Sequence, residues 1–551
     1  MNAATPDPQD GGVALSSISG LDPAALFSFP LDDFQLEAIA ALNQGHSVVV
    51  SAPTGSGKTL IGEYAIHRAL AHGQRVFYTT PLKALSNQKL RDFREQFGAD
   101  RVGLMTGDLT ANREAPIVVM TTEIFRNMLY AEIEDGDDPL EGVEAVVLDE
   151  CHYMNDSQRG TVWEESIIHC PPAIQLVALS ATVANAGQLT DWIEQVHGPA
   201  DLIVSNFRPV PLQFSFCSAK GLHPLLNEQG TGLHPNCKVW RAPKGHHRRG
   251  KSPKPPQPEP PSMAFMVAQL VERKMVPAIV FLFSRRGCDK SVRDLLKASL
   301  VNEQEARELR LALEAFAQTS PEAVRDGVHA EALLRGVAAH HAGVLPAWKE
   351  LIEQLFQRGL VKVVFATETL AAGINMPART TVISALSKRT ENGHRPLMAS
   401  EFLQMAGRAG RRGLDTQGYV VTMQSRFEGV REAGQLATSP PDPLVSQFTP
   451  SYGMVLNLLQ RYELPKAKEL VERSFGRYLA TLDLAEDQSR IAELRQQLEL
   501  LGETVPDVPW EDFEDYEKQR GRLREERRLL RILQQQAEET LAHELTLALQ
   551  F

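Results

Sequence analysis

Short apolar runs separated by longer stretches of helical character constrain the fold of this chain more than any other feature. Between Phe29 and about Val210 the runs are Ser47–Ser51, Val76–Thr80, Ile117–Thr121, Ala145–Leu148 and Leu176–Ser180. They are rich in Val, Ile, Leu and aromatic residues without strict alternation, which is typical of strands buried on both faces of a parallel sheet. Because the segments between them are long enough for crossover helices, the sequence predicts an α/β domain.

The same pattern returns later in the chain, in runs at Ala278–Phe283, Val361–Thr367, Thr381–Ser384 and Tyr419–Thr422. We therefore expect an α/β protein with two parallel-sheet domains in tandem. The interruption from about residue 221 to 262 has no apolar periodicity. It holds the basic stretch Lys238–Lys254 and a Pro-rich run, which predict an exposed, flexible insertion. The sequence leaves open whether this positive charge touches nucleic acid or is only solvated.

Helical patterning dominates the last part of the chain. Ile491, Leu494, Leu498 and Leu501 follow a 3–4–3 spacing, residues 502–509 break the helix, and a charged helix is predicted from about Trp510 to Leu549. Two antiparallel helices in a coiled-coil hairpin fit this pattern, and so do two helices packed on a globular body.

Charge and cysteine content bear on the partners and the compartment. A net charge of −12 argues against nucleic-acid binding over the whole surface. It still permits a local basic groove, because salt confines charge effects to about 10 Å at 0.1 M. No apolar stretch is long enough for a membrane span, and Met1–Gly20 lacks the features of a signal peptide. Five cysteines without a C-x-x-C pair indicate reduced thiols, hence the cytoplasm or the interior of an organelle.

The strongest local signal is the loop Ala52-Pro-Thr-Gly-Ser-Gly-Lys-Thr59, directly after the first predicted strand. It departs from the usual phosphate-loop pattern only in having Ala52 for the first glycine. Gly55 and Gly57 let backbone N–H groups turn toward phosphate oxygens, Lys58 adds positive charge, and Thr59 offers a hydroxyl to Mg²⁺. A purely structural glycine turn does not explain Lys-Thr at a strand-to-helix junction. We therefore expect ATP with Mg²⁺ to bind Pro53, Thr54, Gly55, Ser56, Gly57, Lys58 and Thr59.

Two carboxylates follow another predicted strand, in Asp149-Glu150-Cys151-His152. The end of that strand places Asp149 at the carboxyl edge of the sheet, where ligands of open α/β sheets bind. We expect Asp149 to hold Mg²⁺, and Glu150 to orient and deprotonate the attacking water. An isolated Asp-Glu pair is usually solvated surface. Its position after the phosphate loop and at the end of its own strand favours the catalytic role.

Paired cations occur in the second half, in Gln404-Met-Ala-Gly-Arg-Ala-Gly-Arg-Arg412. Arg408 and Arg411 lie three residues apart, on one helical face or turn. Two guanidinium groups there can neutralise charge on the γ phosphate in the transition state, as an arginine finger does. A solvated basic helix end is the alternative, but the glycine spacing, which allows close backbone approach, argues against it.

This ordered set of motifs, spread from about Phe29 to Leu479, resembles superfamily-two helicases of the DExH type. Within them it resembles the superkiller-type group of RNA helicases that serve RNA decay and processing. The resemblance implies two RecA-like domains that close over one ATP, RNA-stimulated hydrolysis of Mg²⁺-ATP and 3′-to-5′ movement along RNA. It also implies a monomer whose partners are RNA and proteins of RNA decay or processing.

The family further implies roles for single residues. Phe29 and Gln35 resemble the residues that contact adenine, and Ser180-Ala-Thr182 resembles the motif that couples ATP state to strand movement. Gln404 resembles a residue that positions the attacking water, and Gly373 a residue that approaches the nucleotide closely. The strand-binding positions correspond to Pro81, Lys83, Gly107, Thr121, Thr122, Ser284, Arg285, Thr367 and Thr369. Small hydroxyls and backbone amides suit contacts with phosphates and sugars, although a buried Ser or Thr capping a strand is the alternative for each.

The expected domain boundaries combine these patterns with the resemblance. They are a disordered tail at 1–24, RecA-like domains at 25–210 and 263–435, a linker with insertion at 211–262, a winged-helix-like module at 436–483 and an arch-stalk-like hairpin at 484–551. Family members continue into a helical ratchet domain, whereas this chain stops at Phe551, soon after the predicted hairpin. The resemblance therefore predicts ATP binding but leaves processive unwinding open.

Two features remain open at this point. Ser384–Ala399 resembles the short hairpin that splits duplex ends, and Lys388 and Arg389 in it are either functional or plain loop charges. RNA is favoured over DNA by resemblance only, because Arg412 stands where related DNA-repair helicases often have Pro. A DNA helicase of the repair branch and an RNA-binding scaffold with weak ATPase activity are the alternatives. Intact Lys58, Glu150 and Arg411 speak against the scaffold.

Overall fold

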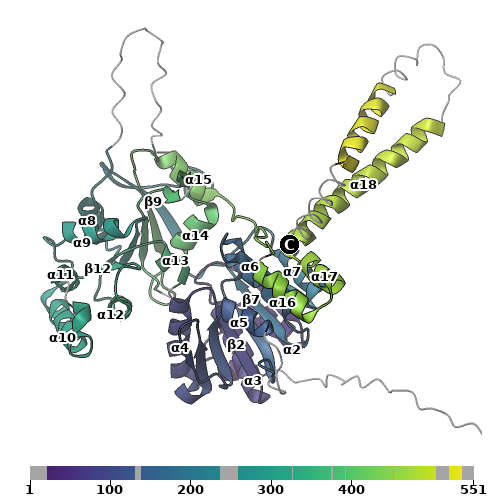
Figure 1. Ribbon diagram of the computed structural model, residues 1–551. Helices are drawn as coiled ribbons and strands as arrows, with labels where there is room; N and C mark the ends of the chain where they lie inside the picture. Colours follow the sequence, from purple (N-terminus) through teal and green to yellow (C-terminus); the bar gives the residue numbers. More distant parts are fainter. Residues whose placement is uncertain are drawn as a thin grey trace, which may run out of the picture.

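The computed structural model describes residues 21–130, 138–235, 237, 259–324, 327–373, 376–390, 393–450, 452–503 and 520–535. It has two α/β domains, each built on a largely parallel sheet, and a helical C-terminal region (Figure 1). The predicted fold class is therefore confirmed. The basic stretch Lys238–Lys254, and the predicted tail up to residue 20, lie outside the described residues. No helix in the described ranges is long and apolar enough to cross a membrane.

The first sheet has eight strands in the order β4-β3-β5-β2-β6-β7-β1-β8. The strands are β1 (Ser47–Ser51), β2 (Arg75–Thr80), β3 (Val102–Met105), β4 (Thr110–Ala111), β5 (Ile117–Thr121), β6 (Val143–Leu148), β7 (Gln175–Ser180) and β8 (Ala200–Val204). Every pairing is parallel except that of β3 with β4. All five predicted strands are confirmed to within two residues at either end. The helices of this domain are α1 (Pro23–Leu26), α2 (Asp33–Asn43), α3 (Thr59–Ala71), α4 (Lys83–Phe97), α5 (Thr122–Leu129), α6 (Gly160–His169) and α7 (Ala186–Val196).

The second sheet has seven strands in the order β10-β9-β17-β14-β11-β13-β12. They are β9 (Leu212–Ser218), β10 (Gly221–Pro224), β11 (Ala278–Phe281), β12 (Val337–His340), β13 (Val363–Ala366), β14 (Thr380–Ile383) and β17 (Gly418–Met423). A separate two-stranded hairpin is formed by β15 (Ser387–Thr390) and β16 (Gly393–Pro396). The helices are α8 (Met263–Glu272), α9 (Arg285–Asp294), α10 (Glu303–Thr319), α11 (Gly327–Leu333), α12 (Pro346–Gln357), α13 (Thr369–Gly373), α14 (Ala399–Gly407) and α15 (Val430–Thr438).

The segment expected to be a linker from residue 211 begins instead with two strands of the second sheet. β9 pairs in parallel with β17, in a register that sets Phe214 beside Val420. Phe216 is buried in the core of this domain, and Leu212 and Phe214 pack against it. The alternation of apolar residues in this strand is the pattern of a half-buried strand. The second domain therefore starts before the basic insertion.

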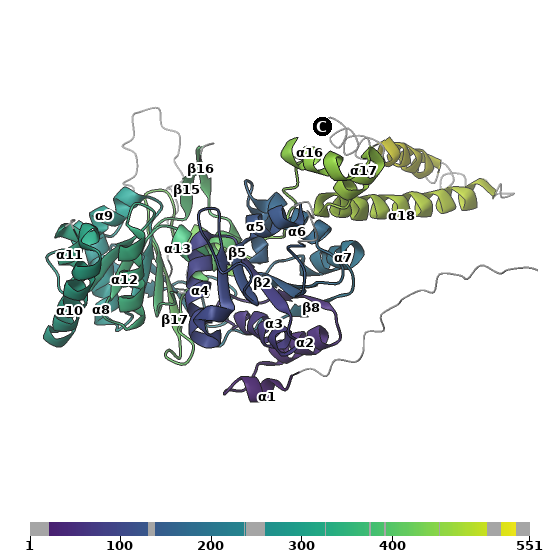
Figure 2. The same cartoon turned by 60° about the horizontal axis from the view of Figure 1, so that its bottom comes forward.

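The C-terminal region consists of α16 (Tyr452–Arg461), α17 (Leu464–Glu472), α18 (Phe475–Glu503) and a further helix at 520–535 beside α18. Helix α18 continues without a break through the expected boundary at residue 484. Figure 2 shows these helices over the first domain and away from the second. The contact is apolar, because Phe475 packs on Trp192 with ring centroids 5.3 Å apart in the first domain's core. The indole N–H of Trp192 also donates to the carbonyl of Arg473 at 2.8 Å.

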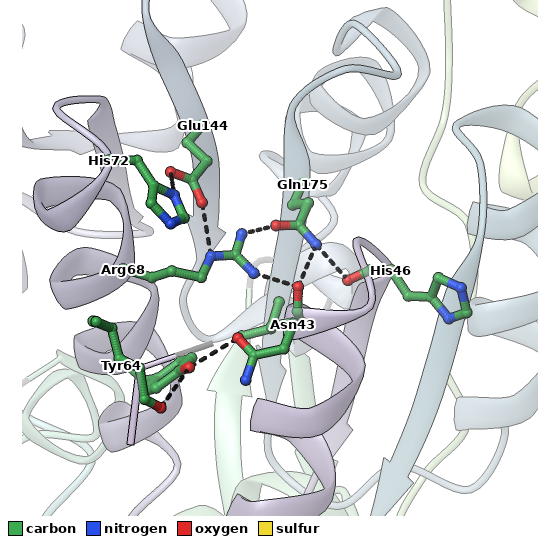
Figure 3. A network of polar contacts seen from close by, with 9 residues as sticks. Asn43, His46, Tyr64, Arg68, His72, Glu144 and Gln175 are labelled. Carbon is green, nitrogen blue, oxygen red and sulfur yellow. Dashed lines mark hydrogen bonds and ion pairs between the residues drawn. The ribbon is translucent and has the colours of Figure 1, made fainter. Parts of the chain in front are cut away.

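A buried polar network fixes the far end of α3, the helix that begins at the phosphate loop (Figure 3). Arg68, in the last turn, donates from Nε to Glu144 Oε1 at 2.7 Å and also contacts the Gln175 side chain and the Leu42 carbonyl. His72 Nδ1 lies 2.9 Å from the other Glu144 oxygen. Because a buried guanidinium is tolerated only when it is paired, this network holds α3 in one position against the sheet.

Candidate nucleotide site and nucleic-acid interface

The phosphate loop lies between the end of β1 and the start of α3, as the sequence predicted. Gly55 and Gly57 have φ values of 84° and 93°, which a side chain would strain. Lys58 Nζ donates to the Ala52 carbonyl at 2.6 Å and the Pro53 carbonyl at 3.0 Å. Burial lowers the pKa of Lys58 to about 8, although Glu150 and Asp149 act to raise it. The lysine is thus a half-buried cation held at the N-terminal end of a helix, where phosphate binds well.

The loop and its surroundings fit a triphosphate. The Ser56 hydroxyl is buried and has no hydrogen-bond partner among the described residues. A Cβ atom at Gly57 would come within 2.9 Å of the Gln35 amide nitrogen, so the loop leaves space for nothing larger than glycine. A phosphate oxygen would accept a hydrogen bond from this unpaired hydroxyl beside the half-buried lysine.

The two carboxylates stand at the carboxyl edge of the sheet beside the loop. Asp149 Oδ2 accepts from the Tyr78 hydroxyl at 2.8 Å, and Asp149 Oδ1 accepts from the Glu150 N–H at 3.0 Å. Burial raises the pKa of Asp149, while nearby Lys89 lowers it. Lys89 Nζ also lies 3.3 Å from the Thr59 hydroxyl. Thr59 and Asp149 therefore offer oxygen ligands close to the position of the Lys89 ammonium group. Oxygen ligands at a position that tolerates positive charge fit Mg²⁺.

His152 was not assigned a role from the sequence, yet it joins several predicted elements. Its Nδ1 accepts from the N–H of Ala181, in the Ser180–Thr182 motif, at 3.2 Å. The same nitrogen lies 3.4 Å from a Glu150 oxygen, and Nε2 lies 3.3 Å from the Gln404 amide nitrogen. Burial lowers the pKa of His152, which favours the neutral ring. Gln404 of the second domain therefore contacts His152 of the first domain, and the His152 ring also lies beside Glu150.

The two arginines predicted as partners occupy different surroundings. Arg408 caps the end of α14, is buried, and donates from Nε to the Ala371 carbonyl at 2.9 Å. Burial lowers its pKa, opposed by the negative charge of Glu150 nearby. Arg411 instead turns to Asp415, with Nε–Oδ2 at 2.8 Å and Nη2–Oδ1 at 3.0 Å. In this structure Arg408 therefore lies near Glu150 while Asp415 binds Arg411, and their shared role at the γ phosphate stays a prediction.

Arg412 and Arg208 make the direct contacts between the second domain and the phosphate loop. Arg412 Nη1 lies 3.3 Å from the Ser56 carbonyl and 3.1 Å from Asp32. Arg208 follows β8 and donates to the Thr54 carbonyl at 3.1 Å and to the Gly407 and Ala409 carbonyls at 2.9 and 2.6 Å. Burial lowers the pKa of Arg208 to about 10, so it stays charged at neutral pH. No local motif marks Arg208, which is why the sequence did not reveal it.

Of the two residues expected to contact adenine, Gln35 lies next to the loop. Gln35 is buried, donates to the Gly57 carbonyl at 3.0 Å and accepts from the Asp32 N–H at 2.9 Å. It therefore braces the loop in this structure. Phe29 is 51% exposed, which leaves its ring face available for stacking. Gly373 is the last residue of α13.

A groove of about 600 Å³ runs between the two domains on the side of the predicted strand-binding residues. From that set its lining includes Pro81, Lys83, Gly107, Thr121 and Thr369. The lining residues that the sequence missed include Asn127, Arg159, His340, His341 and Lys349. They carry no short motif, and only the folding of both domains brings them together.

Four predicted strand-binding residues do not line this groove. The buried Thr122 hydroxyl donates to the Thr80 carbonyl at 3.3 Å, and Ser284 caps α9 by accepting from the Gly287 N–H at 3.0 Å. These are the structural roles named above as the alternative. The Thr367 hydroxyl lies 2.9 Å from that of Thr369, and Arg285 is exposed at the start of α9.

Comparison with known proteins agrees with this geometry. Residues 32–189 match the model of the DEAD/DEAH box helicase family, and residues 315–413 match the helicase conserved C-terminal domain. The chain is 45% identical, over 91% of its length, to the DExH-box ATP-dependent RNA helicase DExH15, chloroplastic, of Arabidopsis thaliana, and covers 47% of that protein. It is 44% identical over 82% of its length to the probable helicase HelY of Mycobacterium tuberculosis, and covers 52% of it.

A third relative is the superkiller complex protein 2 of Mus musculus, with 40% identity over 88% of this chain and 40% of the relative. The chain thus spans about half the length of the curated relatives it matches. The matches run through both sheet domains and the motifs around Lys58, Glu150 and Arg408. The chain belongs to the superfamily-two DExH helicases, in the superkiller-type group of RNA helicases.

Proposed function

We propose that this chain is the motor part of an ATP-dependent RNA helicase that hydrolyses Mg²⁺-ATP and moves 3′ to 5′ along RNA, in RNA processing or decay. One observation carries the proposal: groups from both domains converge on one site. Lys58 and Glu150 belong to the first domain; Arg412 of the second domain contacts the phosphate loop at the Ser56 carbonyl, and Gln404 reaches His152 beside Glu150. A site shared in this way is complete only when the domains are together.

Each group has a role that follows from its position. Lys58 and the loop N–H groups would bind the β and γ phosphates, and Phe29 and Gln35 would contact adenine. Glu150 holds and deprotonates the attacking water, with Gln404 and His152 fixing its orientation. Arg408 stabilises negative charge that builds on the γ phosphate. Mg²⁺, held by Thr59 and Asp149, would supply positive charge to the phosphate oxygens.

Hydrolysis is linked to movement through the two domain contacts. Arg208 and Arg412 bind carbonyls of the phosphate loop, so the position of the second domain follows the shape of that loop. The groove for the strand lies between the same two domains. Opening and closing would therefore shift Pro81 and Thr121 relative to Thr369 along the bound backbone.

RNA is proposed as the substrate because relatives with 38–45% identity carry the name RNA helicase. The groove offers hydroxyl, amide and carboxylate groups that can bond a ribose 2′-hydroxyl, which is the physical basis for preferring RNA. No partner protein and no oligomer is needed to complete the nucleotide site, and we propose a monomer.

The experiment is strand displacement on matched RNA and DNA duplexes with a 3′ or a 5′ single-stranded tail, with and without ATP. We expect opening of the 3′-tailed RNA duplex and stronger stimulation of ATP hydrolysis by RNA than by DNA. Stronger stimulation of ATP hydrolysis by DNA would indicate a DNA helicase of the repair branch instead. If the native chain hydrolysed ATP no faster than the Glu150→Gln variant, the chain would be an RNA-binding scaffold.

A further inference from the structure

The hairpin of β15 and β16 is tied to the second domain by four charged side chains, which we call the hairpin cluster: Glu368, Lys388, Arg395 and Glu401. Lys388 Nζ lies 2.7 Å from Glu368 Oε2 and 2.8 Å from Glu401 Oε1. Arg395 donates to both oxygens of Glu401, at 2.9 and 2.6 Å. The cations come from the two strands of the hairpin and the anions from the domain body, so the cluster clamps both strands.

The two anions belong to segments that serve different sites. Glu368 lies between Thr367 and Thr369, at the point where the loop after β13 enters the groove. Glu401 stands in the first turn of α14, the helix that carries Gln404 and is capped by Arg408. Seven residues of helix separate Glu401 from Arg408, a distance of about 10 Å. Lys388 therefore touches both the strand side and the nucleotide side of the domain.

The surroundings distinguish Lys388 from an ordinary loop lysine. Its side chain is only 16% exposed. Burial acts to lower the pKa of Lys388, but its hydrogen bonds to Glu368 and Glu401 outweigh burial and raise it. In the same way, hydrogen bonds from Arg395 and Lys388 overcome burial and lower the pKa of Glu401. Paired charges in a partly buried place hold one geometry far better than exposed pairs do.

The hairpin cluster also lines a cavity that reaches the nucleotide side of the domain. A second cavity of about 600 Å³ between the domains is lined by Lys388, Arg395 and Glu401, and also by Gln404 and His152. Arg159 and Thr369 line both this cavity and the strand groove. The hairpin cluster thus shares a cavity with the side chains beside Glu150, and that cavity meets the strand groove at Arg159 and Thr369.

We propose that the hairpin cluster is the mechanical connection through which α14 sets the position of the hairpin against the bound strand, with Lys388 as its central positioning residue. This inference rests on the proposed helicase function. A shift of α14 on domain closure moves Glu401, and the two strands follow because Lys388 and Arg395 are both held by it. Glu368 keeps the hairpin in register with the loop that grips the strand.

The test uses the full chain with Lys388→Met, which keeps the length of the side chain and removes its charge. At saturating RNA, ATP hydrolysis should stay within about twofold of the native rate, while duplex opening per ATP falls about tenfold, as expected for a lost coupling between two sites. Arg395→Gln should show the same separation of the two activities. Lys388→Arg, which keeps the charge, should restore most of the opening.

Arg389→Met is the matched control, because Arg389 is the neighbouring cation on the same strand, is exposed and lies outside the cluster. It should open duplexes at nearly the native rate. Equal losses in Arg389→Met and Lys388→Met would assign the effect to hairpin charge and overturn the inference. A parallel fall of hydrolysis and opening in Lys388→Met would overturn it as well. A native chain that RNA does not stimulate would contradict the proposed function itself.

Discussion

Glu150 sits in a left-handed backbone conformation, with φ of 55°, directly after the buried Asp149. Such a conformation is unfavourable for a residue with a side chain and is found where geometry matters for function. It points the carboxylate toward His152 rather than along the strand. The positions of Asp149 and Glu150 are therefore set by separate contacts.

Glu150→Gln should remove the base and leave the metal ligand in place. We expect ATP turnover to fall by about 10²–10⁴-fold while nucleotide still binds. Single-turnover hydrolysis and binding of a fluorescent ATP analogue would measure the two effects. Lys58→Ala is the contrasting variant and should lose binding. Undiminished turnover in Glu150→Gln would remove Glu150 from its proposed role.

Arg208→Lys tests the guanidinium fork between the domains. Lysine keeps the positive charge but cannot reach the Thr54, Gly407 and Ala409 carbonyls at once. Leaving such carbonyls unpaired costs about 1–3 kcal/mol, so ATP turnover should fall roughly tenfold. The control is Arg358→Lys, at the end of α12 in the second domain, where Arg358 pairs with Glu308 at 3.5 Å; it should change turnover little. A normal rate for Arg208→Lys would show that the fork is dispensable.

Single residues were predictable where a motif is contiguous. Asp149 and Glu150 follow β6 within two residues, and Lys58 and Thr59 end the loop that directly follows β1, so sequence order brings all four to one sheet edge. Arg208 acts through backbone carbonyls, and His152 acts through the Ala181 N–H and the Gln404 amide. Such contacts leave no spacing pattern in the sequence. Arg411 was placed beside Arg408 by spacing, but the sequence does not show that Asp415 competes for it.

At the scale of elements, the contact between α6 and the start of α18 depends on one buried carboxyl. Glu164 accepts from the Ser446 hydroxyl at 2.7 Å and from the Phe475 N–H at 2.8 Å. Burial raises the pKa of Glu164 from 4.5 to about 7, although these hydrogen bonds act to lower it. The folded protein thus holds a proton there that the unfolded chain releases between these pH values.

The stability that Glu164 contributes should therefore decrease as the pH rises from 4.5 to about 7. Glu164→Gln has no such proton, so its stability relative to the native chain should improve over this range, by about 3 kcal/mol at most. Denaturant midpoints at several pH values would measure the difference. A difference that does not change with pH would contradict this account.

Strands were recognised from the sequence where they are both fully buried and rich in large apolar residues. β1, β5 and β7 are buried along nearly their whole length, so their sequences are continuous apolar runs. β8 lies at the edge of its sheet with exposed Leu202 and Val204, and it reads as irregular sequence. β12 is only four residues long and contains two alanines, too weak a signal to separate from a helix.

At the scale of the whole molecule, an ion pair joins the domains beside the groove. Arg91 of α4 pairs with Glu350 of α12, and its other nitrogen lies 3.8 Å from Glu353. The Arg91 and Glu350 side chains are 45% and 43% exposed, so the pair contributes only about 0–1 kcal/mol. This pair by itself therefore does little to hold the two domains together.

Arg91→Ala should accordingly shift the RNA concentration for half-maximal ATPase stimulation by less than about fivefold, and the shift should shrink at high salt. Titrations with RNA at two ionic strengths would check this. Arg91→Glu, which repels Glu350, should have the larger effect, and adding Glu350→Arg should reverse most of it. An increase far above fivefold in that RNA concentration for Arg91→Ala would show that this ion pair contributes strongly to domain closure.

Helix α18 has 29 residues, and its first residue is anchored on Trp192 and Glu164 of the first domain. A straight helix of that length extends about 44 Å. It acts as a lever with its fulcrum on the first domain: a rotation of only about 10° at the base carries the tip through roughly 8 Å. Because its base is fixed to the first domain, the far end of α18 magnifies any tilt that occurs at that contact.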